Sequence, residues 1–159
     1  MAGMPKYPPF EARARIKAWC DRQERAQSEV RQKLYTWQLD KETIDSMVAE
    51  MILANYVNEE RFATTFARGK FRIRQWGWKR IEQELKRKGI AAYAIARAKA
   101  ENEPKDYQST LTELLRKKAG TINAKNPYDL RAKLARYGIS KGYSFEEINT
   151  ALNGDWQEG

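Results

Sequence analysis

The sequence lacks histidine altogether and has one cysteine among its 159 residues. The absence of histidine removes the commonest general base, the commonest metal ligand and the usual partner of a serine or cysteine nucleophile. Cys20 cannot form an internal disulfide, and its place on an expected helix favours a small, half-buried apolar side chain over a reactive thiol. The composition therefore argues against a metal centre and against nucleophilic catalysis.

Carboxylate pairs do not replace these missing groups. Glu59 and Glu60 are adjacent, and Glu82 and Glu84 are two residues apart, so neither pair converges on one substrate from a helix. The sequence also has no glycine-rich nucleotide-binding loop and no cluster of metal-ligating residues. We therefore expect no catalytic residues, no metal and no cofactor, and we predict that the protein is not an enzyme.

Long apolar runs and strand-like patterns are missing too. No run approaches the ~20 residues that span a bilayer, and residues 1–10 contain three prolines and no hydrophobic signal core. Together with the lone cysteine, these features predict a cytoplasmic protein without membrane contact. Apolar residues recur at helical spacing through most of the chain, and no stretch alternates like a strand, so we expect an all-α fold.

Apolar positions repeat along the chain at intervals of about fifty residues. A shift of 51 residues places Leu39 on Ile90, and a further shift of 53 places Ile90 on Tyr143 and Gly89 on Gly142. This periodicity predicts tandem three-helix repeats. We expect three of them, in an elongated arrangement that suits the 32% of charged residues. The predicted boundaries are 9–55, 56–102 and 103–153, with flexible tails at 1–8 and 154–159.

One long helix is predicted from about residue 58 to residue 75. Asn58 is a good N-cap residue. At 100° per residue, Phe62, Phe66 and Ile73 share one face of this helix, which we expect to be its buried face.

Positive charge is concentrated in the middle of the chain. The formal charge is +9, and residues 61–89 contain ten Lys or Arg against two acids, whereas residues 1–60 contain nine against ten. A solvated helix face usually mixes the two signs in i,i+4 pairs, so this excess favours a surface that contacts a polyanion. Its contacts would be to phosphates and indifferent to base sequence. The residues expected to bind nucleic acid or a nucleic-acid filament are Arg61, Arg68, Lys70, Arg72, Arg74, Trp76, Lys79, Arg80, Lys86, Arg87 and Lys88.

Two tryptophans flank Gly77 inside this basic segment. Trp76 and Trp78 could stack on bases or lie against a partner protein. The alternative, which we favour for at least one of them, is that they fill the junction between two helices.

Four motifs resemble those of the RecX family of bacterial RecA regulators. Tyr-Val-Asn-Glu-Glu-Arg-Phe-Ala at 56–63 is similar to the family's Tyr-Leu-Asp-Asp-Glu-Arg-Phe-Ala signature, and a basic helix follows it. Residues 80–90 resemble the Arg-Ile, Glu-Leu and Lys-Gly-Ile block. The segments 29–34 and 141–146 resemble elements of the first and third repeats, so the resemblance covers roughly residues 11–153.

Asn58 and Glu59 replace the Asp-Asp of the family signature and keep its capping ability, and two further departures bear on helix stability. Ala26 stands where the family often has a serine cap, which removes a stabilising contribution of ~1 kcal/mol at the start of the second helix. Gly138 replaces an apolar residue, and glycine is a poor choice for a helix interior. We therefore expect the packing to be weakest in the third repeat.

The resemblance implies a curved, extended molecule of three-helix repeats that binds in the groove of the RecA–DNA filament. There it implies modulation, usually inhibition, of recombinase, ATPase and co-protease activity in DNA repair, recombination and the SOS response. We expect a monomer whose partners are the RecA filament and DNA. A stand-alone, sequence-independent DNA-binding protein remains the alternative, since the charge pattern alone indicates only a polyanionic partner.

Overall fold

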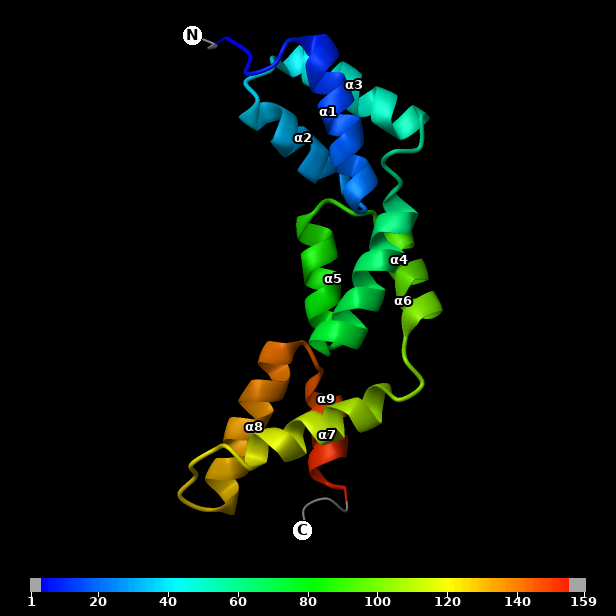
Figure 1. Cartoon of the computed structure of the whole chain (residues 1–159). Helices are drawn as coiled ribbons and strands as arrows, with labels where there is room; N and C mark the ends of the chain where they lie inside the picture. The colour runs from blue at the N-terminus through cyan, green and yellow to red at the C-terminus, as the bar shows by residue number, and fades with distance from the viewer. Residues whose placement is uncertain (1–3, 155–159) are drawn as a thin grey trace. The chain divides into compact units, whose positions relative to one another are not determined.

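The computed structural model describes residues 4–154, and within this range the chain is helical and contains no strand (Figure 1). The predicted all-α class is therefore confirmed. The chain forms two compact units, Met1–Thr65 with Leu85–Ala98 (unit 1) and Phe66–Glu84 with Lys99–Gly159 (unit 2). The predicted second repeat is thus shared between the units.

The first repeat consists of α1 (Pro9–Arg22), α2 (Gln27–Thr36) and α3 (Lys41–Leu53), which pack against one another in unit 1. Pro9 opens α1 at a position where its missing N–H costs nothing. Ala26 has no side-chain acceptor, but the Glu29 carboxylate accepts a hydrogen bond from the Ala26 amide (2.8 Å) and closes the start of α2. Burial of apolar side chains holds the three helices together. The largest fully buried ones are Ile16, Leu34, Met47 and Met51.

The first described residues, which belong to the tail expected at 1–8, pack on this repeat. The Lys6 amide donates to the Trp37 carbonyl at 2.8 Å. The Tyr7 ring meets the Trp37 ring edge-on, with 5.2 Å between centroids, and the Arg15 guanidinium lies 4.1 Å from the Tyr7 centroid. The contact between the Tyr7 and Trp37 rings explains why this segment packs on the repeat, which its three prolines did not indicate. The expected tails also include residues 1–3 and 155–159, which lie outside the described range.

The predicted helix over 58–75 changes its winding before it ends. Its first part is α4 (Glu59–Gly69), and Lys70–Arg74 form a π-helical turn, η1, that ends at Gln75 in a left-handed conformation (φ 54°). Because a π turn bonds i to i+5, later residues fall behind the 100° register of an α-helix. Ile73 is therefore 81% exposed, not buried as predicted, and Phe71 is buried in its place.

Two helices complete the second repeat and three form the third. They are α5 (Trp78–Arg87), α6 (Ala92–Asn102), α7 (Tyr107–Ala119), α8 (Pro127–Lys141) and α9 (Phe145–Leu152). The last three pack against one another in unit 2. Asn126 and Ser144 cap α8 and α9 by accepting hydrogen bonds from the amides of Asp129 and Glu147.

The predicted repeat is visible in the backbone. Gln38, Gly89 and Gly142, which occupy equivalent positions, have φ values of 62°, 82° and 104° and thus share the left-handed conformation that turns the chain after a helix. The residue that follows each of them is buried. These residues are Leu39, Ile90 and Tyr143.

Gly138 is a packing residue, which corrects its interpretation as a weak point of the third repeat. It is buried inside α8, and a Cβ atom there would lie 2.8 Å from both Cγ1 and Cδ1 of Ile148 on α9. Ile148 is itself fully buried and has little room to move. The missing side chain therefore lets α8 and α9 approach closely, a benefit that outweighs the low helix propensity of glycine.

This contact predicts opposite effects for one substitution at two helical glycines. Gly138→Ala should destabilise the protein by about 1 kcal/mol, because overpacking outweighs the gain in helix propensity. Gly69→Ala should stabilise it by roughly 0.5–1 kcal/mol, since nothing lies within 4 Å of a Cβ placed at Gly69. Chemical denaturation of the two variants measures both effects. Equal stabilisation by both substitutions would contradict the packing role of Gly138.

Candidate nucleic-acid interface

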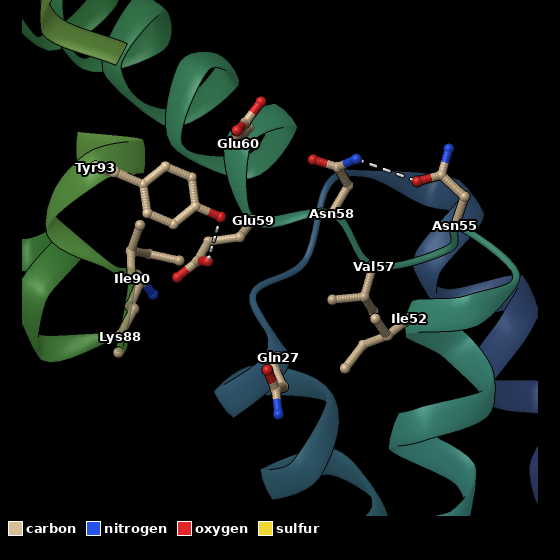
Figure 2. Close-up of a pocket in the computed structure, with 11 residues that line it drawn as sticks. Gln27, Ile52, Asn55, Val57, Asn58, Glu59, Glu60, Lys88, Ile90 and Tyr93 are labelled. Carbon is tan, nitrogen blue, oxygen red and sulfur yellow. Dashed lines mark hydrogen bonds between the residues drawn. The ribbon is translucent and has the colours of Figure 1, made fainter. Parts of the chain in front are cut away.

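The most specific signature segment, residues 56–63, makes bonds within unit 1. The Asn58 side chain accepts from the Arg61 amide at 2.9 Å and so caps α4. The Glu59 carboxylate accepts from the Ala91 amide at 2.5 Å. It also accepts from the Tyr93 hydroxyl at 3.3 Å (Figure 2). The signature thus joins the start of α4 to the start of α6.

A cavity of about 440 Å³ lies beside this segment, and Figure 2 shows Asn55, Asn58, Glu59 and Tyr93 around it. Asn55 and Asn58 hydrogen-bond to each other across 3.1 Å. Glu60, also in the lining, pairs with Arg97 at 3.0 Å. Since the charged signature residues already have partners in the chain, the segment acts as a structural connection.

Two of the predicted binding residues are bound to acids in the same unit. The Arg61 guanidinium pairs with Glu24 and also donates to the Asn55 carbonyl at 3.0 Å. Lys88 pairs with Glu29 at 3.1 Å. Lys86 and Arg87, also in unit 1, are exposed in the last turn of α5.

The other predicted residues belong to unit 2, where the structure brings them onto η1, α5 and the adjoining end of α4. Four of these side chains are exposed and three are half-buried. The exposed ones are Arg68, Arg72, Arg74 and Lys79, and the half-buried ones are Lys70, Trp76 and Arg80.

A contact between two glycines holds this basic segment against α8. The Gly77 amide donates to the Lys141 carbonyl at 2.8 Å, and the Lys79 amide donates to the Gly142 carbonyl at 3.0 Å. A Cβ at Gly77 would lie 2.3 Å from the carbonyl carbon of Gly142, and one at Gly142 would lie 2.7 Å from the Gly77 oxygen. Only two residues without side chains allow this approach. We call this contact the glycine junction.

Four buried aromatic side chains support the glycine junction. The rings of Phe71 and Trp78 are stacked with 6.0 Å between centroids, and Tyr107 contacts Phe71 edge-on at 5.8 Å and Tyr143 at 5.2 Å. The Trp78 amide donates to the Tyr107 hydroxyl at 2.9 Å. Burial raises the pKa of both Tyr107 and Tyr143 well above the ordinary tyrosine value, so both remain neutral hydrogen-bonding groups. Trp78 therefore fills a helix junction, as one of the two interpretations predicted.

The same contacts determine what the start of α5 can bind. The amides at the beginning of a helix have no partner inside it and often attract anions. Here the amides of Gly77, Trp78 and Lys79 are all occupied by groups of the third repeat. These three amides are therefore not available to an anion, which leaves the basic side chains as the main donors in this region.

Trp76 is half-buried, and its ring contacts two basic side chains. The Arg80 guanidinium carbon lies 3.9 Å from the ring centroid of Trp76, and the Lys70 ammonium lies 4.7 Å from it. Phe66 contacts the same ring edge-on at 6.4 Å. Cation–π attraction to Trp76 thus restrains two of the predicted binding residues. Neither of the two interpretations of Trp76, contact with bases or a partner and filling of the helix junction, included this role.

Lys141 joins the basic residues, although the sequence interpretation missed it. Its ammonium donates to the Arg74 carbonyl at 2.8 Å, next to Arg80, which donates to the Ser140 carbonyl at 3.3 Å. Burial, and then the charges of Arg80 and Arg74, lower the pKa of Lys141. A signal was available, because the 53-residue shift that relates the repeats places the predicted site residue Lys88 on Lys141.

The lowered pKa has a consequence for stability. A lysine that is harder to protonate in the folded state than in the unfolded state destabilises the fold at neutral pH. The cost is present below the folded-state pKa and disappears only as the pH rises above the unfolded value, near 10.5. The fold thus retains a partly buried lysine beside two arginines, at a cost in stability at neutral pH.

Arg68 and Arg72 have a different environment within unit 2. Both line a cavity of about 490 Å³ together with three acidic residues. These acids are Glu101, Glu103 and Asp106. The two arginines therefore lie in mixed charge, whereas the group around Lys141 is positive only.

Three further findings on residues 4–154 concern metal ligands, the cysteine thiol and membrane-spanning helices. No group of three or more Cys, Asp or Glu side chains there could hold a metal ion. Burial raises the pKa of the Cys20 thiol, which makes it less reactive. Within the same range, no helix has the length and apolar character needed to cross a membrane.

The glycine junction predicts that Gly77→Ala destabilises the protein by about 3 kcal/mol, because the new methyl group meets backbone atoms that cannot rotate away. Gly120→Ala is the control, since its Cβ would make an ordinary 3.5 Å contact with the Lys117 carbonyl. Thermal unfolding compares the two variants with the native sequence. A transition of Gly77→Ala that coincides with the native one would show that the backbones do not touch.

Known proteins place the chain in one family. Models of the second and third three-helix domains of RecX match residues 58–98 and 105–152. A regulatory protein RecX from Vibrio campbellii is 33% identical over 132 residues, which are 83% of this chain and 83% of that protein. RecX of Corynebacterium efficiens is 28% identical over 90% of this chain and 72% of its own length. For RecX of Clostridium beijerinckii, also 28% identical, the chain spans 60% of the relative.

Solved structures show the same fold. The crystal structure of RecX from Lactobacillus salivarius has a TM-score of 0.76 and 20% identity, and covers 91% of this chain and 94% of that one. Another RecX crystal structure has a TM-score of 0.82 and 18% identity, and covers 92% of this chain and 72% of that one. The domain matches and the 33% identical relative lead to one conclusion: the chain belongs to the RecX family of regulatory proteins.

Proposed function

We propose that this protein binds the RecA–DNA filament and modulates, by inhibition, its recombinase, ATPase and co-protease activities in DNA repair, recombination and the SOS response. In this proposal it acts as a cytoplasmic monomer without a cofactor and catalyses no reaction itself. Membership of a family of regulatory proteins supports the regulatory role.

The observation that carries the proposal is the concentration of cations in unit 2. Arg74, Arg80 and Lys141 lie together, and Lys79 is exposed at the start of α5. Five described ion pairs elsewhere join residues distant in sequence, including Arg13–Glu50 and Arg31–Asp45. No described ion pair neutralises these four side chains within residues 4–154. A surface of this kind suits phosphate groups, whichever base sequence they belong to.

Binding to a filament, rather than to DNA alone, is tested by ATP hydrolysis. The protein should lower the DNA-dependent ATPase rate of the cognate RecA when it is present far below the amount that saturates the DNA. Such action requires that it recognises the filament. If the rate falls only at amounts that coat the DNA, the protein is a stand-alone DNA-binding protein and the filament proposal fails.

The wider basic surface on α4, η1 and α5, which includes Arg68 and Arg72, is tested by charge reversal. Arg68→Glu, Arg72→Glu and Lys79→Glu, combined in one variant, should weaken filament binding on the order of tenfold or more and make it less sensitive to salt, since fewer counterions are released. All three side chains are exposed, so helical content should stay the same.

The matched control reverses three exposed charges elsewhere in unit 2, with Lys117→Glu, Lys125→Glu and Arg136→Glu. Both variants are compared by filament binding at several salt concentrations and by circular dichroism. If the two variants bind the filament equally well at moderate salt, the binding surface does not lie on α4, η1 and α5.

A further inference from the structure

We propose that Arg74, Arg80 and Lys141 form one phosphate-binding site, built by the glycine junction from the second and third repeats. Its ligand is a single phosphate group, which on nucleic acid is one phosphodiester of the backbone. The nucleic-acid occupant rests on the function proposed above, whereas the site itself does not.

Contacts within unit 2 hold two of the three cations in place. Arg80 is fixed on one side by the Trp76 ring, 3.9 Å from its guanidinium carbon, and on the other by the Ser140 carbonyl. Lys141 is fixed by the Arg74 carbonyl. A cation held in this way loses less conformational entropy when a ligand binds.

The donors suit a phosphate group. The Arg80 guanidinium has five N–H groups in a planar fork, and among the described residues one of them has an acceptor, the Ser140 carbonyl. Such a fork matches two phosphate oxygens, and a lysine ammonium adds a third, more flexible donor. Arg74 adds an exposed positive charge close enough to affect the pKa of Lys141.

The mutual repulsion of these three cations favours the binding of an anion among them. Burial disfavours the charged form of Lys141 most, and the charges of Arg80 and Arg74 add to this effect. No described ion pair brings a carboxylate to any of the three cations. Elsewhere the chain brings acids to its bases over long sequence separations, as in Arg61–Glu24. A phosphate would reverse the repulsion, and chloride in bulk solution would only screen it.

A purely structural role for Lys141 explains its hydrogen bond but not the two arginines near it. Its bond to the Arg74 carbonyl closes the end of η1 and would be satisfied by a neutral donor. It does not require two further arginines nearby. The structural role and the phosphate site therefore differ in their dependence on anions.

Thermal unfolding of the full chain in phosphate and in chloride tests the site, at one pH and one ionic strength. A phosphate concentration of ten times Kd should raise the Tm by about 4 °C relative to chloride, because the ligand binds the folded state only. Lys141→Gln, which keeps a donor for the Arg74 carbonyl, should lose most of this rise. Arg74→Gln should lose part of it, and it leaves all the described backbone bonds intact.

Lys117→Gln is the matched control, an exposed lysine on α7 in the same unit, and it should keep the full rise. The site is disproved if the native chain has the same Tm in both salts. It is also disproved if Lys141→Gln and Arg74→Gln both retain the rise of the control.

A second measurement identifies the occupant. Binding of a labelled single-stranded oligonucleotide should have a salt dependence (log K against log salt) shallower by about 0.7 in Arg74→Gln than in Lys117→Gln, since one phosphate contact is lost. Equal slopes, together with loss of the phosphate-dependent Tm rise, would show that the occupant is a free phosphate compound and would overturn the nucleic-acid assignment.

These results are independent of the RecA assay. If the native chain leaves RecA ATP hydrolysis unchanged but shows the phosphate effect, the proposed function fails and the site stands. The opposite outcome is that the native chain and the Lys141→Gln and Arg74→Gln variants all inhibit RecA, while the native chain shows no phosphate effect. In that case the site fails and the function stands.

Discussion

The close approach of Gly77 and Gly142 is the contact on which the rest of unit 2 depends. It brings the start of α5 within hydrogen-bonding distance of the last residue of α8 and the glycine that follows it. The aromatic cluster around Trp78 and Tyr107 packs next to this contact, and Lys141 comes to lie near Arg74 and Arg80. A side chain at either glycine would separate these groups, so packing and charge both follow from one backbone contact.

Much of the fold could be predicted from sequence because local signals agreed with one another. Helical periodicity, the caps at Asn126 and Ser144, and the left-handed positions at Gly89 and Gly142 all specify one chain path. The errors arose where tertiary contacts prevail. The π turn that exposes Ile73 and the close contact that makes Gly138 favourable have no local signature. Both depend on what another segment places nearby.

The candidate site was predictable in composition but not in geometry. The excess of bases at 61–89 directed attention to the segment that contains Arg74 and Arg80, yet it could not separate these two from Arg61 and Lys88, which pair with acids. Nor could it supply Lys141, which arrives from a different repeat. Burial of Lys141, together with the charges of Arg80 and Arg74, lowers stability at neutral pH, and this is the kind of cost that functional sites retain.

The central claim is that the start of α5 and the third repeat form one cooperative unit through the glycine junction. Native-state hydrogen exchange of the Gly77, Trp78 and Lys79 amides tests it most directly, because their acceptors all belong to the third repeat. The account predicts that these amides exchange only when unit 2 opens, with the same free energy as the amides of Leu111 and Leu115 in α7. Exchange at the rate of surface amides, while α7 stays protected, would contradict it.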